Sequence, residues 1–345
     1  MESADVRTLA QGIYGMMKEN GKIWIAWEYD GSIRSKVLSK EMKSPFFTFT
    51  RFEGAKKPMV FLRYPVAMVQ TFFTLAKEKP GVLVVQNPSI VLSFFSALVK
   101  PLFNYRLVID LHTLYLHPSG FKKLIMQFLN DYSLKRGDIV IVTNESYKVR
   151  IKEKTGREIF VLPDHIPDFE YEFEKMALRG KNNVLFICTF SEDEPWKEVI
   201  QAAELMDKET CIYISGKNRL NRDEVPSNVV LTGFVPTKDY QNLLRSADIA
   251  MVLTSQEDCL VCGGYESVSA EKPLILSDTE VLREYFDKGT VFTGNNANDI
   301  AGAIKLAIKN RSALEKNIRK LKSRRNSEWQ RQWERLMGKL SCVKR

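Results

Sequence analysis

The chain has 345 residues and a mass of 39.7 kDa, which is more than one hydrophobic core usually serves and favours two domains. Apolar residues make up 44% and charged residues 27%, values that exclude collagen-like, disulfide-scaffold and wholly disordered chains. The net charge is +9, and residues 311–345 supply all of it with twelve basic and three acidic residues. The balanced remainder argues against a nucleic-acid-binding protein.

Two further properties of the composition restrict the class of protein. Five scattered cysteines in a chain without a secretory signal indicate reduced thiols and a cytoplasmic protein, and the lone pair Cys259 and Cys262 is too few ligands for structural zinc. The most apolar run, residues 82–103, is interrupted by Gln86-Asn87-Pro88 and by Lys100, so we expect no transmembrane helix. A basic excess in residues 18–63, ten basic against five acidic residues, is suited to an anionic membrane surface.

The chain opens with an apolar stripe at helical spacing, formed by Val6, Leu9, Ala10, Ile13, Met16 and Met17. It predicts an amphipathic helix over residues 1–20 that packs on the body of the protein or lies on a membrane. Short β-branched or aromatic runs then alternate with helical patterns, which is typical of a parallel α/β domain. We expect strands at 22–28, 45–50, 82–86, 106–111, 138–143 and 159–162, and helices at 33–42, 65–77, 90–102 and 121–135.

A second series of the same kind follows a charged stretch that ends in Arg179-Gly180-Lys181-Asn182-Asn183, which reads as a hinge. Its expected strands are 184–189, 211–215, 229–232, 249–253, 274–277 and 290–292, and its expected helices are 196–206, 237–246, 265–270, 281–285 and 297–308. The prediction is therefore two doubly wound domains, residues 21–175 and 182–310, which face each other across a cleft. A basic helix over residues 311–345 returns to the first domain and docks Trp329 and Trp333 on protein.

Several common chemistries lack the residues that they need. There is no phosphate-binding G-x-x-x-x-G-K-[ST] loop and no G-x-G-x-x-G after a strand, which removes kinase, ATPase and classical dehydrogenase functions. There is also no H-E-x-x-H and no G-x-S-x-G, so zinc peptidases and serine hydrolases are excluded as well. We expect no metal, because no D-x-D sequence sits at the end of a strand.

The most informative segment runs from Thr254 to Glu266, from the end of a strand into a helix. Gly263 and Gly264 allow backbone amides to approach a ligand, and the helix N-terminus that follows favours a diphosphate. Glu266, expected in the first turn of that helix, can accept both hydroxyls of a ribose or can simply stabilise the helix N-terminus.

Asp258 and Glu266, with the sequence S-V-S-A-E-K-P after them, resemble the acidic-x7-Glu motif of GT-B glycosyltransferases related to family 4. Four other stretches are similar to the β-1,4-mannosyltransferases that act on lipid-linked chitobiose and to their prokaryotic relatives. They are Val85-Gln86-Asn87-Pro88-Ser89, Ile109-Asp110-Leu111-His112-Thr113, Thr189-Phe190-Ser191-Glu192-Asp193-Glu194 and Ile214-Ser215-Gly216-Lys217. The S-G-L-D-L-P-M-K loop of those enzymes is absent, so the resemblance leaves the donor and acceptor open.

The resemblance implies transfer of a hexose from a nucleoside-diphosphate sugar, with UDP or GDP as the nucleotide and no further cofactor. It assigns donor binding to the second domain, through Thr189, Ser191, Gly216, Lys217, Asp258, Gly263, Gly264 and Glu266. In that assignment Lys217 pairs with the phosphates, two hydroxyls donate to them, and Glu266 contacts the ribose.

For the first domain the resemblance implies an acceptor site and a general base. His112 is the candidate that contacts the donor sugar or removes the acceptor proton, and Asp110 is the rival base. Acceptor contacts are expected from Glu28, Arg34, Gln86 and Asn87. The acceptor is expected to be a lipid-linked or polysaccharide-precursor sugar, and the protein a peripheral one at the inner face of the membrane.

Two other functions remain open at this point. One is a nucleotide-sugar 2-epimerase, which shares the two-domain architecture but needs no acceptor site. The other is a catalytically silent protein that binds a nucleotide sugar, or a basic protein that contacts a membrane through its tail. The acceptor-side stretches argue against the epimerase, and Lys217 with Glu266 argues against the silent protein.

Overall fold

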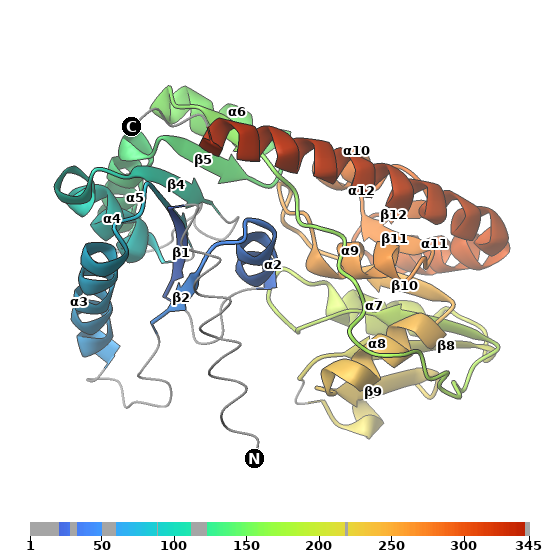
Figure 1. The fold of residues 1–345 in the computed structure, drawn as a ribbon. Coiled ribbons are helices and arrows are strands. Elements are labelled where there is room, and N and C mark those ends of the chain that lie inside the picture. Colours follow the sequence, from blue (N-terminus) through green and yellow to red (C-terminus); the bar gives the residue numbers. More distant parts are fainter. Residues whose placement is uncertain are drawn as a thin grey trace, which may run out of the picture. The chain divides into compact units, whose positions relative to one another are not determined.

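The computed structural model describes residues 21–27, 33–49, 60–87, 89–111, 123–217 and 220–341. The chain divides into two compact units: unit 1 consists of residues 1–164 and 331–345, and unit 2 of residues 165–330. Each unit contains one parallel sheet with helices packed against it (Figure 1). The amphipathic helix expected over residues 1–20 lies outside the described residues.

The sheet of unit 1 has six parallel strands in the order β2-β1-β3-β4-β5-β6. The strands are β1 (Lys22–Ala26), β2 (Phe46–Thr48), β3 (Val82–Gln86), β4 (Arg106–Asp110), β5 (Ile139–Val142) and β6 (Ile159–Val161). The central strands are buried along their whole length, as expected for apolar runs covered on both faces. In the register of β3 with β4, Gln86 pairs with Asp110, so the polar residues that end these strands lie side by side.

The helices of unit 1 are α2 (Ile33–Glu41), α3 (Val60–Glu78), α4 (Ile90–Phe103), α5 (Lys123–Arg136) and α6 (Glu145–Thr155). Consecutive pairs from α3 to α6 are in contact, so these four helices form one layer on the sheet. Right-handed crossovers place α2 on the other face. Apolar side chains of the strands and of α3, α4 and α5 share one core with Tyr147 and Ile151 of α6.

Two helices of unit 1 differ from the sequence prediction. The sequence analysis does not predict α6, because most of its residues are polar and show no apolar stripe. Asn144 caps its N-terminus, and Gly156 ends it in a left-handed conformation. Helix α3 begins at Val60, five residues before the predicted start at Pro65. Proline favours the first turn of a helix, but α3 continues through it.

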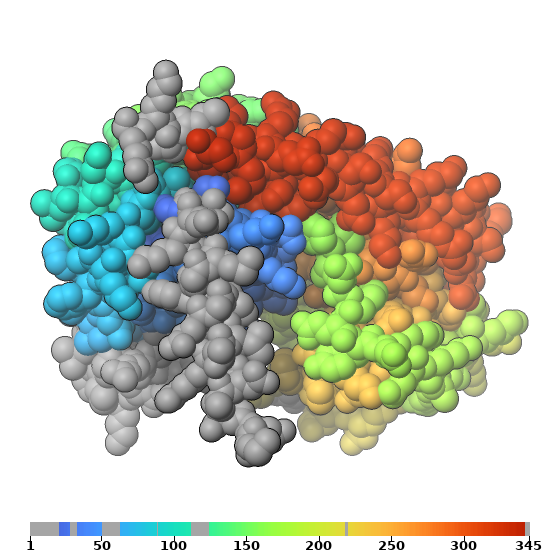
Figure 2. All heavy atoms as spheres, viewed as in Figure 1, coloured from blue at the N-terminus to red at the C-terminus, as the bar shows by residue number. Residues whose placement is uncertain are grey.

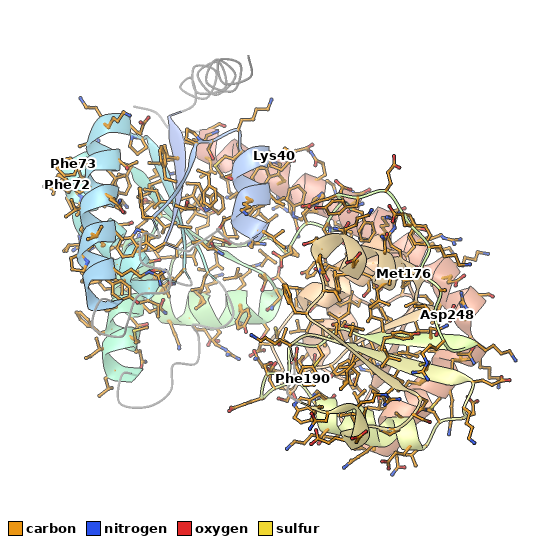
Figure 3. The ribbon with its side chains drawn as sticks, turned by 90° about the horizontal axis from the view of Figure 1, so that it is seen from below. Lys40, Phe72, Phe73, Met176, Phe190 and Asp248 are labelled. Carbon is orange, nitrogen blue, oxygen red and sulfur yellow. The ribbon has the colours of Figure 1, made fainter. Side chains whose placement is uncertain are left out.

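The sheet of unit 2 also has six parallel strands, in the order β12-β11-β10-β7-β8-β9. The strands are β7 (Asn182–Phe186), β8 (Thr210–Ser215), β9 (Val229–Gly233), β10 (Ile249–Val252), β11 (Leu274–Ser277) and β12 (Thr290–Thr293). Asp248, labelled in Figure 3, precedes β10 and accepts a 2.7 Å hydrogen bond from the backbone N–H of Asn183 on β7. Two doubly wound domains, as predicted from the alternation of strands and helices, are confirmed.

The helices of unit 2 are α7 (Trp196–Glu204), the 3₁₀ helix η4 (Arg222–Glu224), α8 (Thr237–Ser246), α9 (Cys262–Ser269), α10 (Glu280–Tyr285), α11 (Ala297–Lys309) and α12 (Arg311–Ser341). Helices α7 and α11 contact each other and share one core with the sheet. Helices α8, α9 and α10 form a second core with Ile318 and Leu321 of α12.

The boundary between the units falls between Asp164 and His165, whereas the predicted first domain ends at residue 175. The segment that follows Asp164 packs on unit 2, because Ile166 is buried in its core and Ser269 donates to the carbonyl oxygen of Pro167. Further along, the backbone N–H of Glu174 donates to Asn242 of α8 at 3.0 Å. The charged residues of this segment indicated a hinge, but its backbone is hydrogen-bonded to helix α8.

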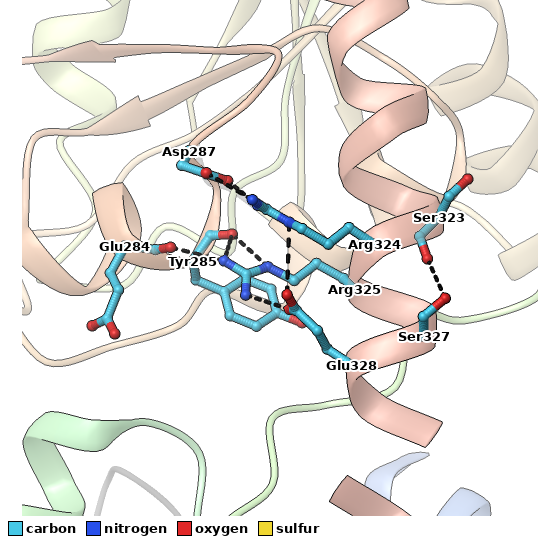
Figure 4. A network of polar contacts seen from close by, with 8 residues as sticks. All are labelled: Glu284, Tyr285, Asp287, Ser323, Arg324, Arg325, Ser327 and Glu328. Carbon is cyan, nitrogen blue, oxygen red and sulfur yellow. Dashed lines mark hydrogen bonds and ion pairs between the residues drawn. The ribbon is translucent and has the colours of Figure 1, made fainter. Parts of the chain in front are cut away.

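The long helix α12, in red in Figure 2, belongs to unit 2 up to Gln330 and to unit 1 from Arg331. Within unit 2, Arg324 pairs with Asp287, and Arg325 donates to the carbonyl oxygen of Tyr285 and lies 4.2 Å from the centre of its ring (Figure 4). The side chains of Trp329 and Trp333 are buried, which confirms that the indoles dock on protein.

Much of the positive charge of α12 is held in ion pairs. The basic residues that contact carboxylates are Arg311, Arg319, Lys322, Arg324, Arg325 and Lys339. Such pairs are worth little individually at a surface. The buried side chains of α12, among them Ile318, Leu321 and Trp329, therefore account for its packing better than these pairs do.

Candidate functional site

The predicted donor residues gather at the carboxyl ends of three neighbouring strands in unit 2. Strands β10, β7 and β8 are adjacent in the sheet, and the segments that follow them, including the start of α9, carry all eight residues. Thr189 and Ser191 follow β7, Gly216 and Lys217 follow β8, and Asp258, Gly263, Gly264 and Glu266 follow β10. Ligands of doubly wound sheets bind outside this edge.

The loop after β7 is organised by the carboxylate of Glu194. One of its oxygens accepts hydrogen bonds from the backbone N–H of Thr189 at 2.8 Å, from the hydroxyl of Thr189 at 3.0 Å and from the backbone N–H of Ser191 at 3.0 Å. Phe190, between them, has a left-handed backbone (φ 61°) and its ring packs 5.5 Å from that of Trp196. The hydroxyl of Thr189 is thus turned to a protein carboxylate, and its predicted phosphate contact stays a prediction.

Asp193 connects this loop to the loop after β10. Its carboxylate accepts from the hydroxyl of Ser191 at 2.6 Å and from that of Thr254 at 2.8 Å, and its carbonyl oxygen accepts from the N–H of Ser255 at 2.7 Å. Burial acts to raise the pKa of Asp193, but the hydrogen bonds from the two hydroxyls outweigh it and the pKa is lowered. An ionised Asp193 therefore holds two of the candidate ligand-binding loops together.

Gly216 is required by the backbone after β8. Its φ is +99°, and a Cβ atom there would lie 2.1 Å from the carbonyl oxygen of Cys188, in the segment after β7. Only glycine allows this close approach. The next residue, Lys217, is exposed. The contact therefore packs the segment after β8 against the segment after β7, and a shared phosphate contact of Lys217 and Thr189 stays a prediction.

Helix α9 begins at Cys262, three residues before its predicted start, so Glu266 lies in the second turn and not in the first. The two glycines lie inside the first turn and are buried. A Cβ atom on Gly263 would lie 3.0 Å from Ile187, and one on Gly264 would lie 2.8 Å from the ring of Phe286. The two glycines thus allow close packing of the helix N-terminus on the protein, and the ligand approach predicted for them stays a prediction.

The carboxylate of Glu266 accepts a short hydrogen bond from the phenol of Tyr240 on α8. Burial raises the pKa of Glu266, and the bond from Tyr240 partly opposes this. Burial and the neighbouring carboxylate raise the pKa of Tyr240 well above its usual value, so the phenol remains protonated and donates. Glu266 is held in one orientation at the edge where a ribose is expected.

The carboxyl edge of unit 1 carries the predicted acceptor residues, at the ends of neighbouring strands β1, β3 and β4. Glu28 and His112 lie outside the described residues. Gln86 and Asn87 are buried, with Gln86 accepting from the hydroxyl of Ser35 at 2.6 Å and Asn87 donating to Asn130 at 3.1 Å. Both amides contact protein, and their predicted acceptor contacts stay predictions.

Arg34 and Asp110 form a buried ion pair. The guanidinium of Arg34 donates to both oxygens of Asp110 at 2.9–3.1 Å, to Asp164 at 2.7 Å and to the carbonyl oxygen of Leu162 at 2.9 Å. Burial alone would lower the pKa of Arg34, but the two carboxylates raise it above its usual value. This geometry argues against Asp110 as a base and against Arg34 as a phosphate ligand, because each already binds the other.

Four residues of these two edges were not singled out by sequence reasoning. They are Tyr240, Glu194, Asp193 and Asp164. Glu194 and Asp193 lie in the quoted stretch T-F-S-E-D-E, so an acidic cluster directly after a strand was the available signal. Tyr240 and Asp164 have no such signal, because their partners are distant in the sequence.

The described residues include neither a candidate metal cluster nor a candidate membrane span. Among these residues, no three His, Cys, Asp or Glu side chains come together as a metal site would require. No described helix is long and apolar enough to span a bilayer.

A comparison with protein-family models finds a similarity in the second half of the chain. Residues 168–324 match the family model described as "Glycosyl transferases group 1", and this segment corresponds closely to unit 2. A search of curated proteins finds no match.

Solved structures extend the similarity to both units. HepE from Anabaena, in complex with UDP, has a TM-score of 0.69 at 13% identity, covering 93% of this chain and 100% of that one. Sucrose-phosphate synthase from Thermosynechococcus elongatus has a TM-score of 0.69 at 14% identity, covering 96% and 92%. A putative UDP-N-acetylglucosamine 2-epimerase from Listeria monocytogenes has a TM-score of 0.59 at 15% identity, covering 86% and 90%. The fold is the predicted GT-B fold.

Proposed function

We propose that this protein is a GT-B glycosyltransferase that moves a hexose from a nucleoside-diphosphate sugar to a sugar acceptor. The observation that carries the proposal is the match of residues 168–324 to the group 1 glycosyltransferases, in the unit whose three adjacent strand ends carry the donor-binding candidates. UDP is the first nucleotide to test, because HepE was solved with UDP. GDP is the second.

The donor is proposed to bind through its ribose and its diphosphate. Glu266, fixed by Tyr240, accepts the ribose hydroxyls, and the exposed ammonium of Lys217 pairs with the diphosphate. The N-terminus of α9 favours the same negative charge through its backbone N–H groups. These groups also stabilise the charge that develops on the leaving diphosphate during transfer.

The transfer step is proposed to need neither a metal nor a further cofactor. His112 is the proposed base that removes the acceptor proton, or the group that contacts the donor sugar. Asp110, at the end of β4, instead binds Arg34.

The acceptor is proposed to be a lipid-linked sugar or a polysaccharide precursor in cell-surface glycan synthesis, reached at the cytoplasmic face of the membrane. The support is the similarity of the V-Q-N-P-S and I-D-L-H-T stretches to mannosyltransferases that act on lipid-linked chitobiose. Glu28 and Asn87 are the proposed acceptor contacts, since they follow adjacent strands.

A nucleotide-sugar 2-epimerase is the second candidate, favoured by the structural similarity to the Listeria protein. An epimerase converts its nucleotide sugar without an acceptor, whereas a transferase releases the nucleotide only when the sugar moves to an acceptor or to water. A catalytically silent protein would bind the nucleotide sugar and leave it unchanged.

The test is a calorimetric panel of UDP, GDP and their common sugar conjugates, supported by thermal shift, because a ligand that binds the native state raises its melting temperature. Saturable binding of one nucleoside diphosphate is expected and fixes the donor class. The bound conjugate is then incubated alone, and formation of its 2-epimer would replace the transferase with the epimerase. A folded sample that binds none of the panel would overturn the proposal.

A further inference from the structure

The outer face of three neighbouring helices in unit 1 is unusually apolar. Helices α3, α4 and α5 lie side by side, with the rings of Phe72 and Phe103 5.1 Å apart across α3 and α4 and those of Phe94 and Tyr132 5.2 Å apart across α4 and α5. Their inner faces are buried on the sheet. In Figure 2, α3 and α4, coloured blue to cyan, lie at the surface of the molecule.

Large apolar side chains occupy the positions of these helices that point away from the sheet. Figure 3 shows Phe72 and Phe73 at the outer edge of α3. The seven most exposed apolar positions are Val69, Phe73, Leu98, Leu102, Leu124, Ile125 and Phe128, each between 51% and 77% exposed. We call these seven residues the apolar face. Large exposed apolar surfaces on a folded protein mark binding sites for proteins or membranes.

Helix α11 of unit 2 shows what an ordinary outer face looks like. The exposed positions of α11 include Asp299, Lys305 and Lys309, and its one large exposed apolar residue is Leu306. In contrast, α4 has a single charged residue, Lys100, which is bound to Asp138 at 2.7 Å. A helix that is apolar on its outer side as well is not built to face water alone.

The charges around the apolar face are predominantly positive. Among the described side chains of α3, α4 and α5, five are Lys or Arg and two are Asp or Glu. Exposed cations lie at the C-terminal ends of α3 and α5, namely Lys77, Lys79, Lys135 and Arg136. Apolar side chains beside lysine and arginine match the boundary between acyl chains and anionic headgroups of a lipid bilayer.

We propose that the apolar face of α3, α4 and α5 docks on a bilayer that contains anionic phospholipid and holds the protein at the membrane surface. The proposal rests on the proposed function in one respect only, since a lipid-linked acceptor must be reached at a membrane. Phe73, Leu102 and Phe128 insert among the lipids, one from each helix, and the cations beside them pair with phosphate groups.

The experiment is co-flotation of the full chain with vesicles of phosphatidylcholine alone or mixed with phosphatidylglycerol. The wild-type protein is expected to float with the anionic vesicles, less with the neutral ones, and less again at high salt. Phe73→Ser, Leu102→Ser and Phe128→Ser are each expected to reduce the floating fraction several-fold. Leu306→Ser removes a leucine of unit 2 that is 48% exposed and is expected to change nothing.

Three measurements separate the outcomes. Calorimetry with UDP on the same variants tests the proposed function independently, so loss of flotation with intact UDP binding supports the docking surface. Wild-type protein that binds UDP but no vesicle, or flotation that survives all three substitutions, overturns the docking surface and leaves the transferase standing. The third measurement is the oligomeric state, by light scattering after size exclusion. A wild-type dimer that the same substitutions convert to a monomer would overturn the membrane docking and make this face a contact with a second copy of the chain.

Discussion

The phenol of Tyr240 on α8 donates a hydrogen bond to the carboxylate of Glu266 on α9, so that two helices of unit 2 meet through a half-buried polar contact. Burial raises the pKa of Glu266, which favours the protonated acid, whereas a bond donated to the carboxylate favours the ionised form. Tyr240 therefore orients Glu266 and also helps to keep it charged.

Tyr240→Phe tests this relationship. Loss of the donor raises the pKa of Glu266 further, and an ionised carboxylate is needed to accept ribose hydroxyls. We expect UDP affinity to fall roughly ten- to a hundredfold, from a hydrogen bond to a charged group worth about 1.5–3 kcal/mol. The acidic limb of UDP binding should also move to higher pH, as measured by calorimetry over a pH series.

The same substitution has an effect on stability with a definite sign. Because the pKa of Glu266 is raised on folding, the folded state binds more protons than the unfolded state between the two pKa values, and stability increases as pH falls through that interval. Tyr240→Phe should extend the interval upward. Tyr171→Phe, an exposed tyrosine of unit 2, is the control. An unchanged pH profile would contradict the positioning role.

Lys217 and Glu266 are predicted to contact different parts of the nucleotide. Lys217→Ala should weaken UDP roughly ten- to a hundredfold while leaving uridine unaffected, because only UDP carries the diphosphate. Glu266→Ala should weaken both ligands through the shared ribose. Lys208→Ala, another exposed lysine of unit 2, serves as the control in the same calorimetric series. Equal losses for UDP and uridine in Lys217→Ala would remove the phosphate role.

His112 is predicted to act in transfer and not in donor binding. His112→Ala should keep the dissociation constant of the nucleotide and lower the transfer rate by roughly 10²–10⁴, the usual contribution of a general base. The readout is nucleotide release with the acceptor present, and His117→Ala is the comparison from the same stretch of sequence. A normal rate in His112→Ala would exclude both of the roles assigned to it.

The alternation of apolar strands with longer helical patterns was sufficient to predict both sheets. Strands β3 and β11 have the predicted bounds, because each is a short apolar run that ends at a polar residue. Helix α6 was missed, since most of its residues are polar and only Tyr147 and Ile151 are buried. Its capping residues Asn144 and Gly156 were the signal that remained in the sequence.

Some residues of the candidate site could also be predicted from the sequence, and others could not. Motifs at strand ends indicated Thr189, Lys217 and Glu266, since a parallel sheet collects its strand ends at one edge. The pairs that hold the site could not be predicted, because Tyr240 is 26 positions from Glu266 and Arg34 is 76 positions from Asp110. Such contacts depend on how the helices pack on each sheet, and no spacing in one sequence encodes that packing.

Gly216 and Gly302 form a matched pair for the next prediction. Gly216→Ala forces a side chain into a left-handed position against the carbonyl oxygen of Cys188, and we expect a loss of about 1–3 kcal/mol in stability and weaker UDP binding. Gly302→Ala on α11 meets open space, and we expect it to stabilise the protein by up to about 1 kcal/mol. Denaturant unfolding measures both. Equal effects would show that the backbone at Gly216 is not constrained as described.

Arg34 and Asp110 are predicted to act as one structural unit. Arg34→Met leaves the carboxylate of Asp110 buried without its main partner and should cost about 3–5 kcal/mol in denaturant unfolding. Lys40→Met removes an exposed cation from the same helix and should cost little. The double variant Arg34→Met with Asp110→Leu should lose less unfolding free energy than the two single variants lose together. The reason is that neither member of the pair is left buried without the other. Additive losses would mean that the two side chains stabilise unit 1 independently.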